Sequence, residues 1–528
     1  MLIAFAALAW QDAGVIVDRN RIDRTPAPRE APARSTPKRG SARVTAVGSE
    51  VPIQGIAFKG AQAPAAVAEA ARRFIGRPGN KDTLLELAGT LSRAYQRTDV
   101  ALYTVAIPEQ DTSGGTVTVL LTEGRIATAA VKSDAKSDRR GNRLLRARMA
   151  PMLDETPLSR GTFERQVTLM RAIPGLSFTT DFADPNATGA LALTVTPKQK
   201  RTRFSAGFSN RGVAQLGDGQ FDAKAEFYGL GIDGDQLTLS ASAASDLKRY
   251  RYLSGAYAVP ITASGLTLTT SGGYLETRPR GYPVLGKAKL AGTSLSYPLI
   301  RSFHRSADLS LGVDGLNSDN AAFGALIATE RTRALRGGAS FADTRDKRSV
   351  AFGLSASQGL DILGARTDPL YADPRFLKLN GSAYLAQAIG KRFVARLQGG
   401  GQWSRDRLPA AERFAVGGDT YGRAFDVGFL SGDRGAGALG EFAVRPIKGK
   451  KFGTSEIYTF VDRAWIGIEG RGGMTVRGDY ALASAGFGTR LRWVDKAELG
   501  LEASRVIDTP YPGYDDDWRF ALAWRLSL

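Results

Sequence analysis

The sequence has no cysteine and a single histidine, His304, among 528 residues. The lack of cysteine excludes disulfides and thiolate nucleophiles, and one histidine leaves almost no histidine-based metal or acid–base site. No run of about 18 apolar residues occurs, so no transmembrane helix is expected. A phosphate-binding loop of the GxxxxGKS or GxxxxGKT type is also absent, which removes that route to ATP. We therefore expect no enzyme, no cofactor and no bound metal.

The charge is strongly positive, with 71 lysines and arginines against 52 acidic residues, a formal net charge of +19. Such a balance suits nucleic acid, anionic lipid or an acidic partner, and composition does not choose among them. The opening run "MLIAFAALAWQDAG" is apolar and reaches Ala7-Leu8-Ala9, the pattern of a secretory cleavage site. We interpret residues 1–9 as the remnant of a signal peptide; a buried strand or helix is the alternative.

Three regions follow along the chain. Residues 10–24 contain "VIVDRNRIDR", which predicts a short amphipathic helix, and residues 25–47 are proline-rich and predict an extended linker. Residues 48–198 twice repeat the order strand, helix, helix, strand, strand, which predicts two tandem α+β domains at 48–123 and 124–198. The best-defined helix spaces Leu84, Leu87, Ala88, Leu91 and Tyr95 along one face, with Asp82 as its N-cap.

From residue 202 to 528 apolar and polar residues alternate strictly. About sixteen such segments fit the tilted strands of a closed membrane barrel. Short connections alternate with longer ones near residues 279–286, 316–329, 360–374, 405–433 and 508–517. The last segment places Trp518, Phe520, Leu522, Trp524, Leu526 and Leu528 on one face, with Arg519 and Arg525 on the other. A soluble sandwich or propeller can also alternate in this way, but such a long stretch favours the membrane.

In the last predicted strands, charged residues of both signs occupy the face opposite the apolar one. Arg490 and Arg492 precede the turn "WVDKA", and Glu498 and Glu502 follow it. In a tight hairpin Arg492 would lie nearly opposite Glu498, which stabilises a sheet modestly. These residues form either a solvated ladder without a further role or the wall of a water-filled lumen. Both interpretations require a pore interior instead of a packed core.

One loop-like stretch, "FAVGGDTYGRAFDVG" at residues 414–428, sets Arg423 between Tyr421 and Phe425 in an otherwise small or apolar run. An arginine away from water must be paired, because an isolated buried charge is costly. The residues alone leave open whether Arg423 lies on a mobile external loop or inside the barrel.

The segment "IPEQDTSGGTVTVLLTEGRI", residues 107–126, resembles the end of the first POTRA domain of TpsB transporters. These are the haemolysin secretion/activation proteins of two-partner secretion, in the BamA-like superfamily. The resemblance covers the whole chain. It implies two POTRA domains, a sixteen-strand barrel and an N-terminal helix inside that barrel. It also implies a monomer in the lipid of a Gram-negative outer membrane, with its POTRA domains in the periplasm, that binds a TpsA-like exoprotein and no nucleic acid.

In that family a long loop folds back into the barrel and carries a branched apolar residue, arginine, glycine and an aromatic residue. Residues 422–425, Gly422-Arg423-Ala424-Phe425, resemble this signature, although Gly422 and Ala424 depart from it. The resemblance places Arg423 inside the barrel, on an in-folded loop of residues 406–432. It implies that the partner is Asp462, beside Phe460 on the thirteenth strand, with Glu441 as a second candidate.

The function that the resemblance implies is export of one large unfolded protein. POTRA edge strands can accept an extended client by strand addition. We expect the client to bind in a groove of the second domain, between a strand and a helix. The groove residues are Phe163, Val167, Leu176 and Phe178. Two alternatives stay open. A BamA-like assembly factor usually has more POTRA domains, and a passive porin has no need of about 150 periplasmic residues.

Overall fold

The computed structural model describes residues 21–22, 40–132, 142–183, 189–213, 215–323, 325–447, 449, 451–471, 477–494, 496–512, 514 and 517–528, with the backbone alone at residue 327. The expected signal remnant at residues 1–9 lies outside the described residues. So do nearly all of the expected helix at 10–24 and most of the linker at 25–47. Among the described helices, none is both long enough and apolar enough to cross a membrane.

Two compact units make up the chain. The first, called here the barrel unit, contains residues 1–33, 201–300 and 304–528; the second, the α+β unit, contains residues 34–200 and 301–303. Each is described by itself.

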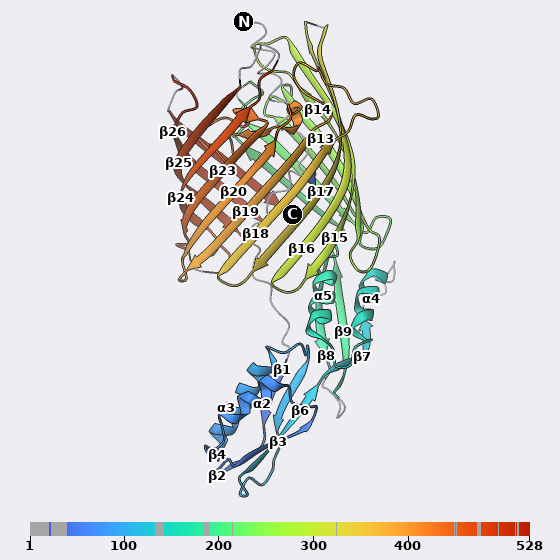
Figure 1. The fold of residues 1–528 in the computed structure, drawn as a ribbon, viewed down its shortest axis with the longest axis vertical. Coiled ribbons are helices and arrows are strands. Elements are labelled where there is room, and N and C mark those ends of the chain that lie inside the picture. Colours follow the sequence, from blue (N-terminus) through green and yellow to red (C-terminus); the bar gives the residue numbers. More distant parts are fainter. Residues whose placement is uncertain are drawn as a thin grey trace. The chain divides into compact units, whose positions relative to one another are not determined.

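In the barrel unit, sixteen strands of the described residues close into one barrel, which confirms the predicted fold class (Figure 1). Neighbours along the chain are neighbours in the sheet, and β27 pairs with β10 to close it. The strands are β10 (Thr202–Ser209), β11 (Gln220–Tyr228), β12 (Gln236–Ala244), β13 (Tyr250–Pro260), β14 (Thr267–Thr277), β15 (Val284–Arg301), β16 (Arg305–Ala322), β17 (Ala325–Thr344), β18 (Arg348–Gly359), β19 (Leu377–Ile389), β20 (Phe393–Ser404), β23 (Arg434–Val444), β24 (Glu456–Ile468), β25 (Gly478–Trp493), β26 (Ala497–Asp508) and β27 (Trp518–Ser527).

The alternation of side chains sets the two faces of the wall, because successive residues of a strand point to opposite sides. In β24, Tyr458, Phe460 and Asp462 are buried toward the interior, whereas Ile457 and Val461 are exposed on the outside. The same alternation that predicts lipid-facing strands therefore delivers polar and charged side chains to the lumen.

One predicted connection is wrong. Residues 316–329 read as a long loop because the segment "NSDNAA" is polar, but β16 continues to Ala322 and β17 begins at Ala325. Their ladder pairs Asn317 with Arg331 and Asp319 with Thr329. Polar residues extend these strands because ladder bonds form equally well beyond the apolar band, where water replaces lipid on the outer face.

The described residues of the α+β unit form two main sheets with their own helices and cores, and a small two-stranded sheet of β2 and β4. The first sheet has the order β1-β5-β6-β3, and the second has the order β7-β9-β8. The first group comprises β1 (Gly40–Val44), β2 (Gly48–Pro52), β3 (Gly55–Gly60), α2 (Ala65–Arg72), β4 (Pro78–Asn80), α3 (Lys81–Tyr95), β5 (Tyr103–Ile107) and β6 (Thr116–Glu123). The second comprises β7 (Arg125–Val131), α4 (Arg143–Met149), the 3-10 turn η2 (Ala150–Met152), α5 (Arg160–Arg171), β8 (Leu176–Phe182) and β9 (Ala190–Gln199).

Two expectations for this unit need correction. Residues 40–44 were assigned to the linker, but they form β1, which pairs in parallel with β5 and extends the first sheet. The N-cap of α3 is Asn80, whose side chain accepts a hydrogen bond from Thr83 N at 3.2 Å, and Asp82 lies inside the helix. Asparagine and aspartate are equivalent N-caps, so the two positions could not be separated by residue type. The predicted apolar face of α3 is buried throughout.

Candidate functional site

The loop between β20 and β23, residues 405–433, is called here the in-folded loop because it lies against the inner wall of the barrel. Its two arms form a small antiparallel hairpin of β21 (Phe414–Val416) and β22 (Leu430–Gly432). The 3-10 turn η3 (Ala410–Glu412) precedes β21. The strand count places this loop after the eleventh barrel strand, as expected.

Glycines shape the tip of the loop. Gly417 and Gly418 have φ values of 102° and 93°, and Gly422 has φ 78°, a region that favours glycine. Gly417 N donates to Tyr421 O at 2.7 Å. A Cβ at position 422 would also come within 2.6 Å of Leu482 Cδ1. The departure from a branched residue at position 422 thus has a local cause in both backbone and packing.

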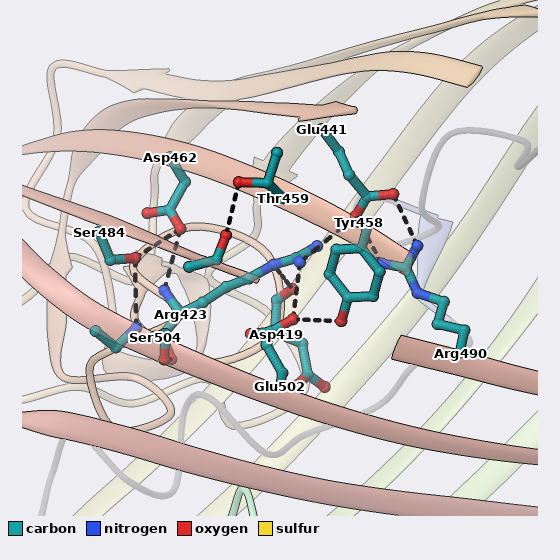
Figure 2. A network of polar contacts seen from close by, with 12 residues as sticks. Asp419, Arg423, Glu441, Tyr458, Thr459, Asp462, Ser484, Arg490, Glu502 and Ser504 are labelled. Atoms are coloured by element: carbon teal, nitrogen blue, oxygen red, sulfur yellow. Dashed lines mark hydrogen bonds and ion pairs between the residues drawn. The ribbon is translucent and has the colours of Figure 1, made fainter. Parts of the chain in front are cut away.

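Asp462 of β24 holds the backbone of the loop tip (Figure 2). Its carboxylate accepts hydrogen bonds from Gly422 N at 2.5 Å and Arg423 N at 3.3 Å. Ser484 of β25 donates its hydroxyl to the same carboxylate at 2.7 Å and accepts from Ala424 N at 3.3 Å. Asp462 is 1% exposed, so these bonds replace the water that a buried carboxylate would otherwise need.

The Arg423 side chain points away from Asp462 toward the other acids of the lumen, as Figure 2 shows. Its Nη1 lies 3.1 Å from Glu502 Oε2 and 3.7 Å from Glu441 Oε2. Its Nε donates to Asp419 O at 3.2 Å, and the guanidinium stacks 4.6 Å from the centre of the Phe460 ring. Arginine suits this position because its planar, weakly hydrated fork combines ion pairs with ring stacking.

The structure therefore brings Arg423, Asp462, Glu441 and Phe460 together, but in a different pairing from the expected one. We expected the guanidinium to pair with Asp462. Instead Asp462 binds the main chain, and the ion pairs of the guanidinium are with Glu502 and Glu441. The physical reason is the sharp turn at residue 422, which aims two N–H groups at Asp462 and sends the side chain along the wall.

Tyr421 fits into a gap in the wall that two glycines leave open. A Cβ at Gly437 of β23 would lie 2.4 Å from the Tyr421 ring, and one at Gly400 of β20 would lie 2.9 Å from its hydroxyl. The ring is 8% exposed. We call this gap the Gly400–Gly437 notch; it gives the loop tip a fixed seat.

Phe425 anchors the other side of the tip and is fully buried. Its ring lies 5.1 Å from Phe429 and 5.2 Å from Tyr514, between ring centres. Ala424, where the family signature has glycine, is 7% exposed in the same cluster. The four residues of the loop motif are thus all engaged with the barrel.

The lumen wall below the tip carries a ladder of alternating charges. The Glu441 carboxylate accepts hydrogen bonds from both terminal nitrogens of Arg490, at 2.7 Å and 2.6 Å. The Arg490 guanidinium lies 3.8 Å from the centre of the Tyr458 ring, and Tyr458 donates its hydroxyl to Glu502 at 2.7 Å. Figure 2 shows that this ladder continues directly from Arg423.

The remaining predicted lumen charges lie on the same wall. Arg492 faces Glu498 across β25 and β26, with Nε 3.2 Å from Oε2. Nearby, Glu456 binds Arg396 at 2.6 Å and Arg445 at 2.9 Å. These ion pairs make the inner wall of the barrel polar, whereas the core of a soluble β-protein is packed with apolar side chains.

Sequence reasoning missed two arginines that tie the loop to the closing strands. Arg211, after β10, forms an ion pair with Glu502 and lies 3.3 Å from Asp419. Arg519 of β27 binds Asp426 of the loop at 2.6 Å. The available signal was the inward position of Arg519 in the alternation; Arg211 lies in a connection, where alternation gives no direction.

The predicted client-binding residues lie in the second part of the α+β unit. Phe163 and Val167 of α5 are core residues, at 1% and 2% exposure, while Leu176 and Phe178 of β8 pack partly buried against that core. The side chains of α5 are therefore not a free surface. Strand β8 lies at the edge of its sheet, because β9 is its only ladder partner among the residues described.

Comparison with known proteins gives a family and a set of similar structures. The model of the family described as haemolysin secretion/activation protein ShlB/FhaC/HecB matches residues 189–491. No curated protein sequence matches. Among solved structures, CdiB from Escherichia coli is similar with a TM-score of 0.69 and 18% identity, over 95% of this chain and 94% of that one. CdiB from Acinetobacter baumannii gives 0.61 and 16%, over 100% and 97%. BamA from Haemophilus ducreyi lacking POTRA domains 1–3 gives 0.56 and 14%, over 91% and 100%.

Proposed function

This chain belongs to the haemolysin secretion/activation protein family and is an outer-membrane protein-secretion transporter, and we propose that it exports a single TpsA-like exoprotein as an unfolded chain through the lumen of its barrel. The observation that carries the proposal is the in-folded loop, which is bonded to the wall at its backbone by Asp462 and at its side chain by Glu502. A loop fixed inside a polar lumen can line a path for an extended chain without exposing that chain to lipid.

We propose that the two parts of the α+β unit are two POTRA domains located in the periplasm. Support comes from the order β3-α2-α3-β5-β6, which recurs as β7-α4-α5-β8-β9; the first part adds the short strands β1, β2 and β4. Capture of the client would use β8, whose free edge can pair with an extended segment by backbone hydrogen bonds. Leu176 and Phe178 would then contribute apolar contacts beside that edge, whereas Phe163 and Val167 would support it from the core.

The likeness to BamA makes an assembly factor the second candidate, because that barrel shares the fold. A passive porin is disfavoured by residues 34–200, a stretch of 167 residues that precedes the barrel, and by a loop bonded inside it. The family match favours export over assembly.

The experiment first asks whether the gene next to this one encodes a large secreted protein, and then uses that protein in a secretion assay. Cells that carry both proteins should release the exoprotein, and cells that carry the barrel unit alone should not. An assembly factor would instead cause the loss of many outer-membrane barrels when it is depleted, and that result would contradict the proposal. A porin would conduct ions with no effect on either measurement.

A further inference from the structure

A second site on the inner wall is built around Glu412, at the start of the in-folded loop and away from Arg423. Its carboxylate is fully buried and, within the described part of the chain, forms ion pairs with Arg336 at 2.9 Å, Lys378 at 2.6 Å and Arg21 at 2.6 Å. Arg21 also donates to Ala411 O at 3.2 Å. Arg21 is 390 residues distant in sequence, so a piece of the N-terminal segment lies in the lumen at this point.

The residue after Arg21 occupies a gap in the wall. A Cβ at Gly338 of β17 would lie 2.6 Å from Ile22 Cγ2, and one at Gly312 of β16 would lie 3.1 Å from Ile22 Cδ1. Gly338 pairs with Ser310, and Gly312 pairs with Arg336, so both glycines sit on adjoining inward rows of the wall. We call this gap the Gly312–Gly338 notch.

The same two rows hold buried polar atoms without a partner. The row of Gly338 continues through Ser355 to Asn380, and the row of Arg336 continues through Ser357 to Lys378. Asn380 Oδ1 and Ser357 Oγ are buried, and neither has a hydrogen-bond partner among the residues that the structure describes. A buried acceptor without a donor is costly and marks a place where an N–H from another chain would be stabilised.

The charges of the site permit exchange of its occupant. When Arg21 leaves, Glu412 keeps Arg336 and Lys378, so no buried carboxylate is left unpaired. Arg336 also keeps Asp314, at 2.9 Å. Arg21 is thus the one of the three cations that lies outside the barrel strands and can be replaced by another basic side chain.

We propose that Glu412, the Gly312–Gly338 notch and Asn380 form a peptide-binding subsite for a basic residue followed by a β-branched apolar residue. Residues 21–22 of this chain occupy the subsite at rest, and an exported chain that carries such a pair displaces them as it passes. The inference rests on the proposed function for its client, but the binding site itself is defined by this chain alone.

The test uses full-length protein in detergent with the double substitution Arg21→Gln and Ile22→Asp, which empties the subsite. A fluorescent octapeptide of glycine and serine with arginine–isoleucine at its centre serves as the probe. It should bind at least about tenfold more tightly than peptides with glutamate–isoleucine or arginine–aspartate, since a charge-assisted bond or a filled apolar notch is each worth about one order of magnitude.

Matched glycine substitutions locate the site. Gly338→Val, or the milder Gly338→Ala, should remove the preference for isoleucine over aspartate because the side chain fills the notch. Gly337→Val is the control, because a Cβ at Gly337 meets nothing within 4 Å. Heat-modifiability on gels verifies that each barrel is folded.

Equal binding of the three peptides, or a preference for isoleucine over aspartate that survives both Gly338 substitutions in folded barrels, would overturn the subsite. Those outcomes leave the proposed function intact if the same barrels still secrete. A barrel that discriminates among the peptides but exports no protein would instead overturn the proposed function and leave the subsite standing.

Discussion

Replacing Arg423 by alanine and replacing Asp462 by alanine should break different bonds of the same loop tip. Arg423→Ala removes the ion pair with Glu502 and the contact with Phe460, but it leaves both backbone N–H groups on Asp462. Asp462→Ala removes those two backbone bonds and the bond from Ser484, but it leaves the guanidinium on Glu502. We therefore expect the two substitutions to be nearly additive.

The magnitudes follow from burial and from the number of partners. The side chains of Arg423 and Glu502 are 10% and 7% exposed, and removing one partner of a buried pair typically costs about 3–5 kcal/mol. Because Glu502 keeps Arg211 and Tyr458, Arg423→Ala should cost about 3 kcal/mol, the lower end of that range. The coupling energy should be about 2 kcal/mol for Arg423 with Glu502 and within about 0.5 kcal/mol for Arg423 with Asp462.

The assay is a double-mutant cycle on unfolding in urea, run in detergent beside a secretion measurement. Arg423→Ala should leave the barrel heat-modifiable and lower secretion sharply. Arg423→Lys should restore little of the secretion, because an ammonium group cannot form the ion pair and stack on the aromatic ring at the same time. A coupling between Arg423 and Asp462 as large as that between Arg423 and Glu502 would refute the division of roles.

Three further outcomes are expected. Gly437→Ala should unseat Tyr421 and lower secretion, whereas Gly399→Ala, whose Cβ would make only an ordinary 3.7 Å contact, should not; equal effects would contradict the notch. Deleting residues 10–40 should raise single-channel conductance in planar bilayers, because the deletion removes Arg21 and Ile22 from the lumen, and unchanged conductance would mean that this segment does not narrow the pore. Photo-crosslinkers along residues 163–182 should trap the client at exposed β8 positions and not at buried α5 positions; trapping elsewhere in the α+β unit alone would exclude β8 as the capture edge.

The barrel and the position of its loop could be predicted because alternation is a local and continuous signal. In each strand the alternation shows which side chains face lipid and which face the lumen. Counting the strands places residues 405–433 after the eleventh strand. The same reasoning fails at residues 316–329, where the polar sequence predicts a loop although ladder pairing does not depend on polarity.

The partners of Arg423 could not be predicted from the sequence, because alternation fixes the face of a residue and not the depth that a loop reaches. Asp462, Glu441 and Glu502 all point inward, and only the turn at Gly422 decides which of them meets the main chain. The two notches could not be predicted for a different reason. Gly400 and Gly437 have no side chain, so the hydropathy pattern does not indicate a contact there. The missing Cβ atoms are nevertheless what makes room for Tyr421.

The 20 residues of β17 have a consequence for the surface around the barrel. At about 3.3 Å per residue the strand is about 66 Å long, whereas about ten tilted residues cross the apolar layer. On its outer face Leu335 is followed by Arg333 and then Arg331, so the hydrocarbon ends between Leu335 and Arg333. We therefore expect lipid headgroup phosphates to lie beside these two guanidinium groups. Beyond them the strand continues for roughly 20 Å, which at a tilt of about 40° raises the wall by about 15 Å, so a chain that leaves the barrel on this side should meet solvent clear of the bilayer.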